Sequence, residues 1–415
     1  MGTEWRSVAE LEAAGVLLVQ DGNHGAYRPV KDEIVEVGIP HVRAADINGD
    51  GEIDFAGAQQ INEVAYQRIR KGRGEPGDVL FTHKGTVGRV ARVPPTAPRF
   101  LCSPQTTFWR SLRRDTIDPG YLHAFIRSDA FAEQVRRRMH ETDMAPYVSL
   151  SAQRQLQIAV PSLPEQRAIA EVLGALDDKI ESNRRVVSDC AALLELAYQS
   201  AIRDAQRRSL GDLGTITGGG TPRSGVEGFW APAEVPWITP SDMTALDGVP
   251  LIWQGSRAIS RAGLSASSAR LLPQGSVVFT SRATIGFVAI AQQELATNQG
   301  FINVVPHPRF SSPFVYSTLR ERRDAIAAKA NGSTFLEVNQ TNFKTVTCQV
   351  PSEERLAAHD AVALPALGPM AGLTVENKRL AAIRDALLPR LVSGRLRVPL
   401  TSDPVEVAEA VLGEP

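Results

Sequence analysis

The 415-residue sequence has few of the residues that build disulfide frameworks or metal sites. Its three cysteines, Cys102, Cys190 and Cys348, lie far apart, and no Cys-x-x-Cys pair occurs. The seven histidines show no ligand spacing such as His-x-x-x-His. A disulfide scaffold and a cysteine-ligated zinc site are therefore not supported, and we expect no metal ion.

The sequence also lacks an excess of either charge and any long apolar run. The 45 Lys and Arg residues against 46 Asp and Glu give a net charge of −1, so no overall basic field indicates a nucleic-acid partner. Local patches count for more than this sum. No apolar run approaches the ~20 residues that span a membrane, and the first residues do not follow the charged-then-apolar pattern of a signal peptide. We expect a cytoplasmic protein of two or more domains.

What the sequence does contain is an internal repeat. Residues 77–91 recur 198 positions later as residues 275–289, with eight of 15 positions identical. Unrelated segments of this length would share roughly one. Residues 39–46 resemble residues 235–242 at a similar offset. A period of roughly 195 residues is too long for a solenoid and indicates two copies of one domain-sized unit, with the same kind of function in each.

Both copies have the pattern of a globular domain with strands, turns and helices. Residues 79–81 and 87–91 predict short strands around a loop at 82–86. An apolar stripe predicts a helix over residues 120–139, and residues 313–329 are its counterpart in the second copy.

Each globular segment is followed by a stretch with helical periodicity. Apolar residues recur every three or four positions over four heptads, which is typical of a coiled coil, and Asn183 is the one polar residue on this stripe. A second stripe repeats the pattern, so we expect the two helices to pair, with Gly394 as the stop of the second. Pro365 and Pro369 predict a kink or break there. The residues expected to pair are Leu173, Leu176, Ile180, Val187, Leu194, Leu373, Leu380, Ile383 and Leu387.

The sequence thus predicts an α+β fold, with two similar mixed α/β globular domains joined by two long helices in a pseudo-twofold internal repeat. The predicted parts are the first domain at 1–160, a central helical spacer at 161–207, the second domain at 208–350, a distal helical spacer at 351–400 and a disordered tail at 401–415.

Two segments imitate catalytic or metal-binding motifs. Residues 118–121 resemble the Asp-Pro-Pro-Tyr tetrapeptide of amino-methyltransferases, but glycine replaces the second proline and no cofactor loop precedes it. The alternative is a helix start with proline in its first turn. Residues 46–54 imitate an EF-hand loop, but Gly57 stands where the bidentate glutamate is due, so the alternative is a polar hairpin turn. We find no active site.

Features of a binding site are stronger. In both copies the repeated loop carries hydroxyl side chains around one cation, which suits contacts to phosphates or base edges. The alternative is a hairpin turn whose threonines satisfy the local backbone. The candidate residues of these loops are Thr82, His83, Lys84, Thr86, Thr280, Ser281, Arg282 and Thr284.

Four further candidates lie outside the loops. Arg43 and Thr239 occupy matching positions after the first repeated strand, and Gln105 and Gln299 occupy matching positions near a later one. A glutamine can pair with adenine, although a buried turn glutamine is the alternative. The side chains differ between the copies, so we expect different ligand details.

Basic and glycine-rich segments are less specific. The clusters at 68–73 and 136–138 suit phosphates or form solvated helix faces. The glycine-rich segment 218–222 lacks the Lys-Ser/Thr of a phosphate-binding P-loop, which favours a flexible connection.

Several motifs around the predicted helices belong together. Residues 163–170 begin Leu-Pro-Glu-Gln, residues 173–184 contain Asp-Asp-Lys-Ile, and residues 387–394 read Leu-Leu-Pro-Arg-Leu-Val-Ser-Gly. Residues 219–238 contain Gly-Gly-Thr-Pro and Val-Pro-Trp-Ile. In these motifs the chain resembles the specificity (S) subunits of type I restriction-modification systems. Residues 351–355 depart from the pattern, since they lack the glutamine of the first copy.

The resemblance implies a non-catalytic DNA-recognition subunit. The two globular segments would be target recognition domains, each reading one half of a bipartite target, and the helices would be an antiparallel coiled coil that fixes the spacer and docks methyltransferase (M) subunits. The implied partners are double-stranded DNA, M subunits and a nuclease/translocase (R) subunit, with S-adenosylmethionine and ATP bound only by partner subunits. The alternatives are a stand-alone DNA methyltransferase, whose cofactor loop and intact tetrapeptide are missing, and a coiled-coil scaffold that does not touch DNA.

Overall fold

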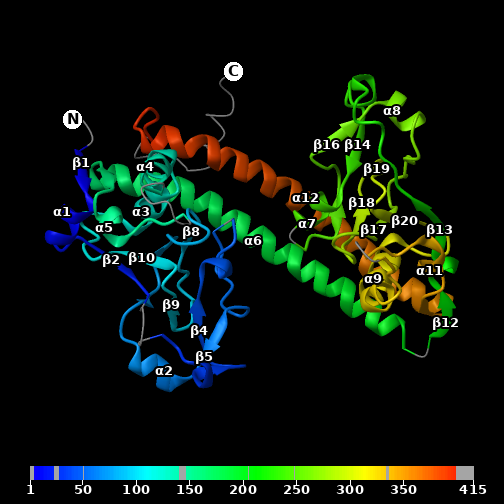
Figure 1. Ribbon diagram of the computed structural model, residues 1–415, viewed down its shortest axis with the longest axis horizontal. Helices are drawn as coiled ribbons and strands as arrows, with labels where there is room; N and C mark the ends of the chain where they lie inside the picture. Colours follow the sequence, from blue (N-terminus) through cyan, green and yellow to red (C-terminus); the bar gives the residue numbers. More distant parts are fainter. Residues whose placement is uncertain are drawn as a thin grey trace. The chain divides into compact units, whose positions relative to one another are not determined.

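The chain divides into two compact units, each built around one copy of the repeat. The computed structural model describes residues 4–22, 28–49, 51–139, 146–203, 205–246, 248–332 and 336–398. The first unit contains residues 1–180 and 379–415, and the second contains residues 181–378 (Figure 1). Each unit therefore holds one repeat together with a part of both long helices. The predicted disordered tail lies outside the described residues.

The first unit contains two sheets and a terminal strand pair. An antiparallel sheet has the order β2 (Leu17–Asp21), β10 (Thr106–Ser111), β7 (Val79–Thr82), β8 (Val90–Arg92). A second sheet has the order β3 (Ile34–Val35), β5 (Gln59–Ile61), β4 (Ile39–Val42), β9 (Phe100–Cys102), β6 (Arg73–Gly74), in which only β4 and β9 are parallel. β1 (Glu4–Ser7) pairs with β11 (Gln157–Val160).

The second unit repeats the central part of this topology, with one more strand in its main sheet and fewer strands in its second sheet. Its main sheet has the order β13 (Gly214–Gly218), β20 (Phe301–Pro306), β17 (Val277–Thr280), β18 (Val288–Ala291), β15 (Leu251–Ile252). A smaller sheet has the order β16 (Arg257–Ile259), β14 (Val235–Ile238), β19 (Ala296–Thr297), in which β14 and β19 are again parallel. β12 (Gln206–Ser209) pairs with β21 (Thr347–Val350). The repeated strand order confirms that the repeat in the sequence is a repeat of the fold.

Short helices cover the sheets of each unit. Those of the first unit are α1 (Val8–Ala13), α2 (Glu63–Arg68), α3 (Pro119–Ile126), α4 (Asp129–Met139) and α5 (Leu150–Arg154). Those of the second unit are α7 (Pro240–Thr244), α8 (Arg261–Ser265), α9 (Ser312–Glu321), α10 (Arg323–Ala327) and α11 (Gln340–Lys344). The long helices are α6 (Leu163–Ala201) and α12 (Glu353–Val392). No described helix is long and apolar enough to cross a membrane.

The helix expected over residues 120–139 is two helices, α3 and α4, and this prediction was wrong in its continuity. The Ser128 hydroxyl donates to the Phe125 carbonyl at 2.6 Å, and it accepts from the Phe131 N–H at 3.4 Å. One side chain therefore satisfies backbone groups at the end of one helix and at the start of the next. The helix expected over 313–329 is likewise divided, into α9 and α10.

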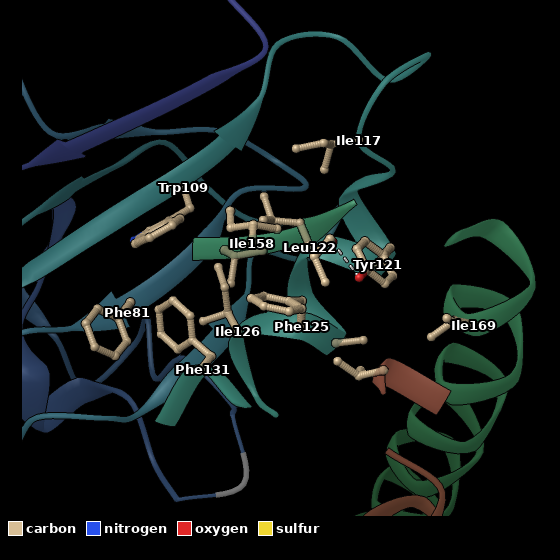
Figure 2. Packing of buried hydrophobic residues seen from close by; sticks show 14 of the residues in the cluster. Phe81, Trp109, Ile117, Tyr121, Leu122, Phe125, Ile126, Phe131, Ile158 and Ile169 are labelled. Atoms are coloured by element: carbon tan, nitrogen blue, oxygen red, sulfur yellow. Dashed lines mark hydrogen bonds between the residues drawn. The ribbon is translucent and has the colours of Figure 1, made fainter. Parts of the chain in front are cut away.

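The core of the first unit joins its sheet to the long helices. Phe81 and Trp109 project from β7 and β10 towards Phe131 of α4, with edge-to-face ring contacts at 5.6 and 5.5 Å (Figure 2). Ile169 of α6 and Leu387 of α12 belong to the same buried cluster. The predicted pairing residues Leu173, Leu176 and Ile383 are also buried in it, with Leu380 packed against it. The beginning of α6 and the end of α12 are therefore both buried in the core of the first unit.

The second unit uses the other halves of the same helices. Val187 and Leu194 of α6 are buried in one cluster with strands of the main sheet, and Leu373 of α12 packs against it. The predicted pairing residue Ile180, the last α6 residue of the first unit, is also buried. Arg355 near the start of α12 donates to the Ser200 carbonyl near the end of α6 at 3.2 Å. Together with the pairing of Asn183 described next, this contact makes the helices antiparallel within the unit.

Asn183 pairs with its own repeat counterpart. Its side chain is buried, and its amide donates to the Asn377 side-chain oxygen at 2.9 Å and to the Glu376 carboxylate at 3.0 Å. Asn377 stands 194 positions after Asn183, at the equivalent place on the second helix. A buried polar pair of this kind sets the register of two apolar stripes that would otherwise pack in several registers.

Replacing Asn183 by alanine is expected to lower the free energy of unfolding of the second unit by about 1–2 kcal/mol, because two hydrogen bonds disappear and partly buried acceptors stay behind. Chemical denaturation measures the change. Ser188→Ala is the matched control, since Ser188 lies on the exposed face of the same helix. Equal effects of the two substitutions would contradict the register role.

Of the kink or break expected at Pro365 and Pro369, the break was wrong, because α12 continues through both residues. Both rings lie on the exposed side of the helix, where water can bind the carbonyls that lose their partners. Ala363 and Met370, on the other side, are fully buried in the core of the second unit. Burial of that side holds the helix together across the prolines. The helix stop at Gly394 was predicted correctly, with a left-handed φ of 71° two residues after α12 ends.

Candidate nucleic-acid interface

The repeated segment folds into the same loop in both units. In the first unit, the Thr82 N–H donates to the Arg89 carbonyl and the Gly88 N–H to the Thr82 carbonyl, both at 2.9 Å. The Thr82 hydroxyl accepts from the Arg89 N–H at 2.9 Å. The second unit repeats all three bonds around Thr280. Both threonines are 0% exposed, so they support the loop from inside, and this is the local role that the sequence left open.

The next residue of each loop ties three segments together. The His83 N–H donates to the Gln105 carbonyl at 3.0 Å, and the His83 carbonyl accepts from the Val148 N–H at 2.9 Å. Ser281 makes the same two bonds, with Gly300 and Val338. His83 and Ser281 are buried. They position the loop and do not present their side chains to a ligand.

The residues beyond these positions form the exposed tip. Lys84 and Thr86 are exposed in the first unit, as is Thr284 in the second, where Arg282 is partly exposed. The Lys84 ammonium lies 5.7 Å from the centre of the Tyr147 ring. These four side chains are the part of each predicted loop set that can reach a ligand.

The backbone of the tip is held in a left-handed turn in both units. Gly85 has a φ of 82°, and its counterpart Ala283 has a φ of 64°. Ala283 is the only residue other than glycine with a positive φ among the residues that the structure describes. An alanine in this region is strained, so its neighbours must impose the conformation of the loop.

Arg43 and Thr239 end two equivalent strands, β4 and β14, beside the loops. Arg43 forms an ion pair with Asp46 at 2.9 Å, and this carboxylate raises the pKa of Arg43. Thr239 donates its hydroxyl to Asp242 at 2.6 Å. Burial alone would raise the pKa of Asp242, but hydrogen bonds from Thr239 and from Ser256 outweigh it, so this pKa is lowered. Both candidates are thus held in place by a carboxylate three residues later.

Gln105 and Gln299 are both exposed, but they are not equivalent, and this part of the prediction was wrong. The backbone partner of His83 is Gln105, whereas the backbone partner of Ser281 is Gly300. Gln299 therefore lies one position earlier, and its side chain accepts a hydrogen bond from Thr221. Matching residues of the two repeats are 198 positions apart in the loop but 195 positions apart in the following strands, β10 and β20. This change of offset is known only from the pairing register of the strands.

The basic clusters are largely engaged within the protein. Arg68 forms an ion pair with Glu33 at 2.5 Å, and Arg73 lies over the Tyr66 ring and donates to its carbonyl at 2.6 Å. In the last turn of α4, Arg136 and Arg137 both pair with Glu133, and Arg138 donates to backbone carbonyls. These contacts favour a structural or solvated role for the arginines of both clusters over a role in phosphate binding.

The glycine-rich segment 218–222 is a packed connection, so the expected flexible connection was wrong. A Cβ atom on Gly219 would lie 1.9 Å from the Asn298 carbonyl oxygen, and one on Gly220 would lie 2.3 Å from the Ala269 nitrogen. Glycine is required here because backbone segments meet closely.

The segments 118–121 and 46–54, which resemble a methyltransferase motif and an EF-hand loop, have structural roles. Asp118 caps α3 by accepting from the Gly120 and Tyr121 N–H groups at 2.8 and 3.0 Å. The Tyr121 ring lies in the core (Figure 2), and its hydroxyl donates to the Ala159 carbonyl at 2.7 Å. The EF-hand imitation is a turn closed by an antiparallel bridge between Ile47 and Ile53. Over the described ranges no group of acidic, histidine or cysteine residues is arranged to hold a metal ion.

Two residues near the loop tips were missed by the sequence reasoning. Tyr147 forms a β-bridge with Lys84, and Glu337 forms the equivalent bridge with Arg282. They stand 190 positions apart, which is also the offset between β11 and β21. Extending the repeat at that offset would have placed them opposite the loops. Each tip thus combines one cation, a nearby threonine and a neighbour of different chemistry, an arrangement suited to phosphates and base edges.

The fold is similar to one already solved. Over almost its whole length the chain is similar to a solved S subunit of a type I restriction-modification system from M. genitalium, with a TM-score of 0.59, 14% sequence identity, and coverage of 94% of this chain and 96% of that one. The predicted fold class, two α+β units joined by two long helices, is therefore confirmed.

The sequence comparisons point to the same family. Residues 202–357 match the model of the type I restriction modification DNA specificity domain. The MjaIX specificity subunit of Methanocaldococcus jannaschii is 34% identical over 154 residues, which are 37% of this chain and 35% of that protein. The HindI specificity subunit of Haemophilus influenzae is 28% identical over 197 residues, 47% of this chain and 42% of that protein. The matches thus span less than half of these relatives. The resemblance to specificity subunits that the sequence predicted is confirmed.

Proposed function

We propose that this chain is the non-catalytic DNA-recognition subunit of a type I restriction-modification complex. Each unit binds one half of a bipartite DNA target through its loop tip, and α6 with α12 fixes the spacer between the halves. The observation that carries the proposal is the pair of equivalent loops with different exposed cations, Lys84 in one unit and Arg282 in the other. One backbone scaffold with two sets of side chains suits two half-sites of different sequence.

The proposal includes the division of labour along the chain. Residues 1–160 and 208–350 are the target recognition domains, and 161–207 with 351–400 are the helical spacers that dock methyltransferase (M) subunits. The remaining partners are double-stranded DNA and a nuclease/translocase (R) subunit in the cytoplasm. S-adenosylmethionine and ATP belong to those partner subunits. Partners also supply much of the phosphate clamp, which suits a chain with a net charge of −1.

Selection of bound DNA from a random pool, with M subunits present, tests the proposal. We expect enrichment of two short defined sequences separated by a gap of constant length. No enrichment would support the alternative of a scaffold that does not touch DNA. Methylation by the chain alone, without M subunits, would support the alternative of a stand-alone methyltransferase. Either result would reject the proposal.

The spacer role has its own prediction. Seven residues inserted after Ile180 in α6, together with seven after Lys378 in α12, leave the contacts inside each unit unchanged, because both sites fall at the boundary of the units. A heptad of helix adds roughly 10 Å at 1.5 Å per residue. The selected gap is therefore expected to lengthen by about three base pairs, with both half-sites unchanged. Changed half-site sequences would mean that the recognition domains are assigned wrongly.

A further inference from the structure

Tyr147 and Glu337 stand at the same place in the two units but carry different chemistry. Tyr147 is bridged to Lys84 and Glu337 to Arg282, each in an antiparallel pairing. The residue that follows each of them donates its N–H to the loop residue before the cation, at 2.9 Å in both units. The backbone therefore places an aromatic ring beside one loop cation and a carboxylate beside the other.

In the first unit the neighbour of the cation is uncharged. The Lys84 ammonium lies 5.7 Å from the Tyr147 ring centre, and the ring lies 5.5 Å from that of His83. A contact with an aromatic face leaves the positive charge of the lysine uncompensated. An approaching phosphate therefore meets an ammonium whose bridge partner carries no charge.

In the second unit the neighbour is an acid. A guanidinium nitrogen of Arg282 lies 4.0 Å from a carboxylate oxygen of Glu337, and the two side chains are 42% and 44% exposed. The Glu337 backbone also exchanges two hydrogen bonds with Asn331, at 2.9 and 3.0 Å. The Glu337 backbone is therefore held between two segments, and its partly exposed carboxylate lies beside the arginine.

We propose that Glu337 is a specificity-determining residue, which keeps Arg282 from binding DNA phosphates and directs its guanidinium to base edges. A phosphate that approaches Arg282 also approaches the Glu337 carboxylate and is repelled, whereas the O6 and N7 acceptors of a guanine carry no net charge. A guanidinium presents its donors in a planar fork, a geometry that matches the two acceptors on the edge of a guanine. Tyr147 places no such restriction on Lys84. The inference rests on the proposed function.

The test is Glu337→Gln in the full chain, assembled with its M subunits. It keeps the size of the side chain but removes its charge, so a phosphate that approaches Arg282 is no longer repelled by a carboxylate at this position. Affinity for DNA without the target is expected to rise several-fold at low salt, and the slope of log affinity against log salt is expected to steepen by about 0.9, the value for one additional phosphate contact. Pool selection should give a less defined half-site for one unit and an unchanged half-site for the other.

Glu234→Gln is the matched control. Glu234 pairs with Arg261 at 3.9 Å in the same unit, but it precedes β14, at the end of that strand opposite to Thr239. This control is expected to leave the salt slope and both half-sites unchanged. The reciprocal change, Tyr147→Glu, is expected to weaken binding to non-target DNA and to make the salt slope shallower.

The outcomes separate the inference from the proposed function. If Glu337→Gln lowers affinity for the target and leaves non-target binding unchanged, Glu337 contacts a base directly and the inference is overturned. An unchanged salt slope with unchanged half-sites also overturns it, while the proposed function stands. Failure of the unsubstituted complex to select any DNA sequence rejects the proposed function itself.

Discussion

Replacing Asp78 by serine is expected to lower the free energy of unfolding of the first unit by about 2–4 kcal/mol. Asp78 is 1% exposed and accepts two parallel hydrogen bonds from the Arg110 guanidinium, at 2.7 and 2.8 Å. Without the carboxylate, the Arg110 guanidinium loses its buried partner and is left with the exposed Glu75. Removing one partner of a buried ion pair costs far more than the pair contributes when intact. Hydrogen exchange of the β7 and β10 amides at increasing denaturant measures this free energy in the first unit alone.

The equivalent positions of the second unit indicate a second substitution that should restore this stability. Strand register places Ser276 of the second unit at the position of Asp78, and Val305 at the position of Arg110. The double substitution Asp78→Ser with Arg110→Val therefore installs a neutral pair that the same fold already uses, and it is expected to restore stability to within about 1 kcal/mol. Glu75→Ala is the control, because Glu75 also pairs with Arg110, at 2.8 Å, but is 64% exposed. Additive losses in the double variant would refute the equivalence of the two sites.

Replacing Arg282 by alanine is expected to weaken binding of the assembled complex to its target by roughly 10- to 100-fold, equal to about 1–3 kcal/mol for one base-reading arginine. The loss should affect a single half-site. Lys84→Ala is expected to blur the other half-site instead. Binding to targets with one altered half-site at a time, at fixed salt, separates the two effects.

Two further variants test whether the loss of target binding in Arg282→Ala comes from base reading or from charge alone. Arg282→Lys keeps the charge but removes the planar fork, so discrimination between bases is expected to fall more than overall affinity. Arg261→Ala removes another exposed cation of the same unit and is expected to change neither half-site. The model of one loop for each half-site fails if Arg282→Ala and Lys84→Ala weaken the same half.

Features with a strong period could be predicted from the sequence. The repeat of residues 77–91 predicted two equivalent loops, because matching side chains at matching spacing require matching backbone turns. The apolar stripes through Leu173 and Leu387 predicted helices that bury one side, and both residues are buried. Patterns of this kind follow from the geometry of helix and strand alone.

Features that depend on contacts between distant segments could not be predicted. Proline in a helix is unfavourable locally, yet α12 continues past Pro365 because its opposite side is buried. The helix over 120–139 divides at Ser128, whose hydroxyl competes for backbone groups that a sequence pattern assigns to one helix. Gln105 is equivalent to Gly300 and not to Gln299, and this shift of one position depends on the register between two strands.

By itself, the sequence determined that the chain is duplicated, that each copy ends in a long helix with an apolar stripe, and that the loops of the two copies differ in their cations. Only the tertiary structure decided which loop residues face solvent and which support the loop from inside. It also placed Tyr147 and Glu337 beside those cations, across 63 and 55 residues of chain. The reason is physical, since periodicity records which side of an element is buried, whereas charge neighbours are set by the pairing of segments that are remote in the chain.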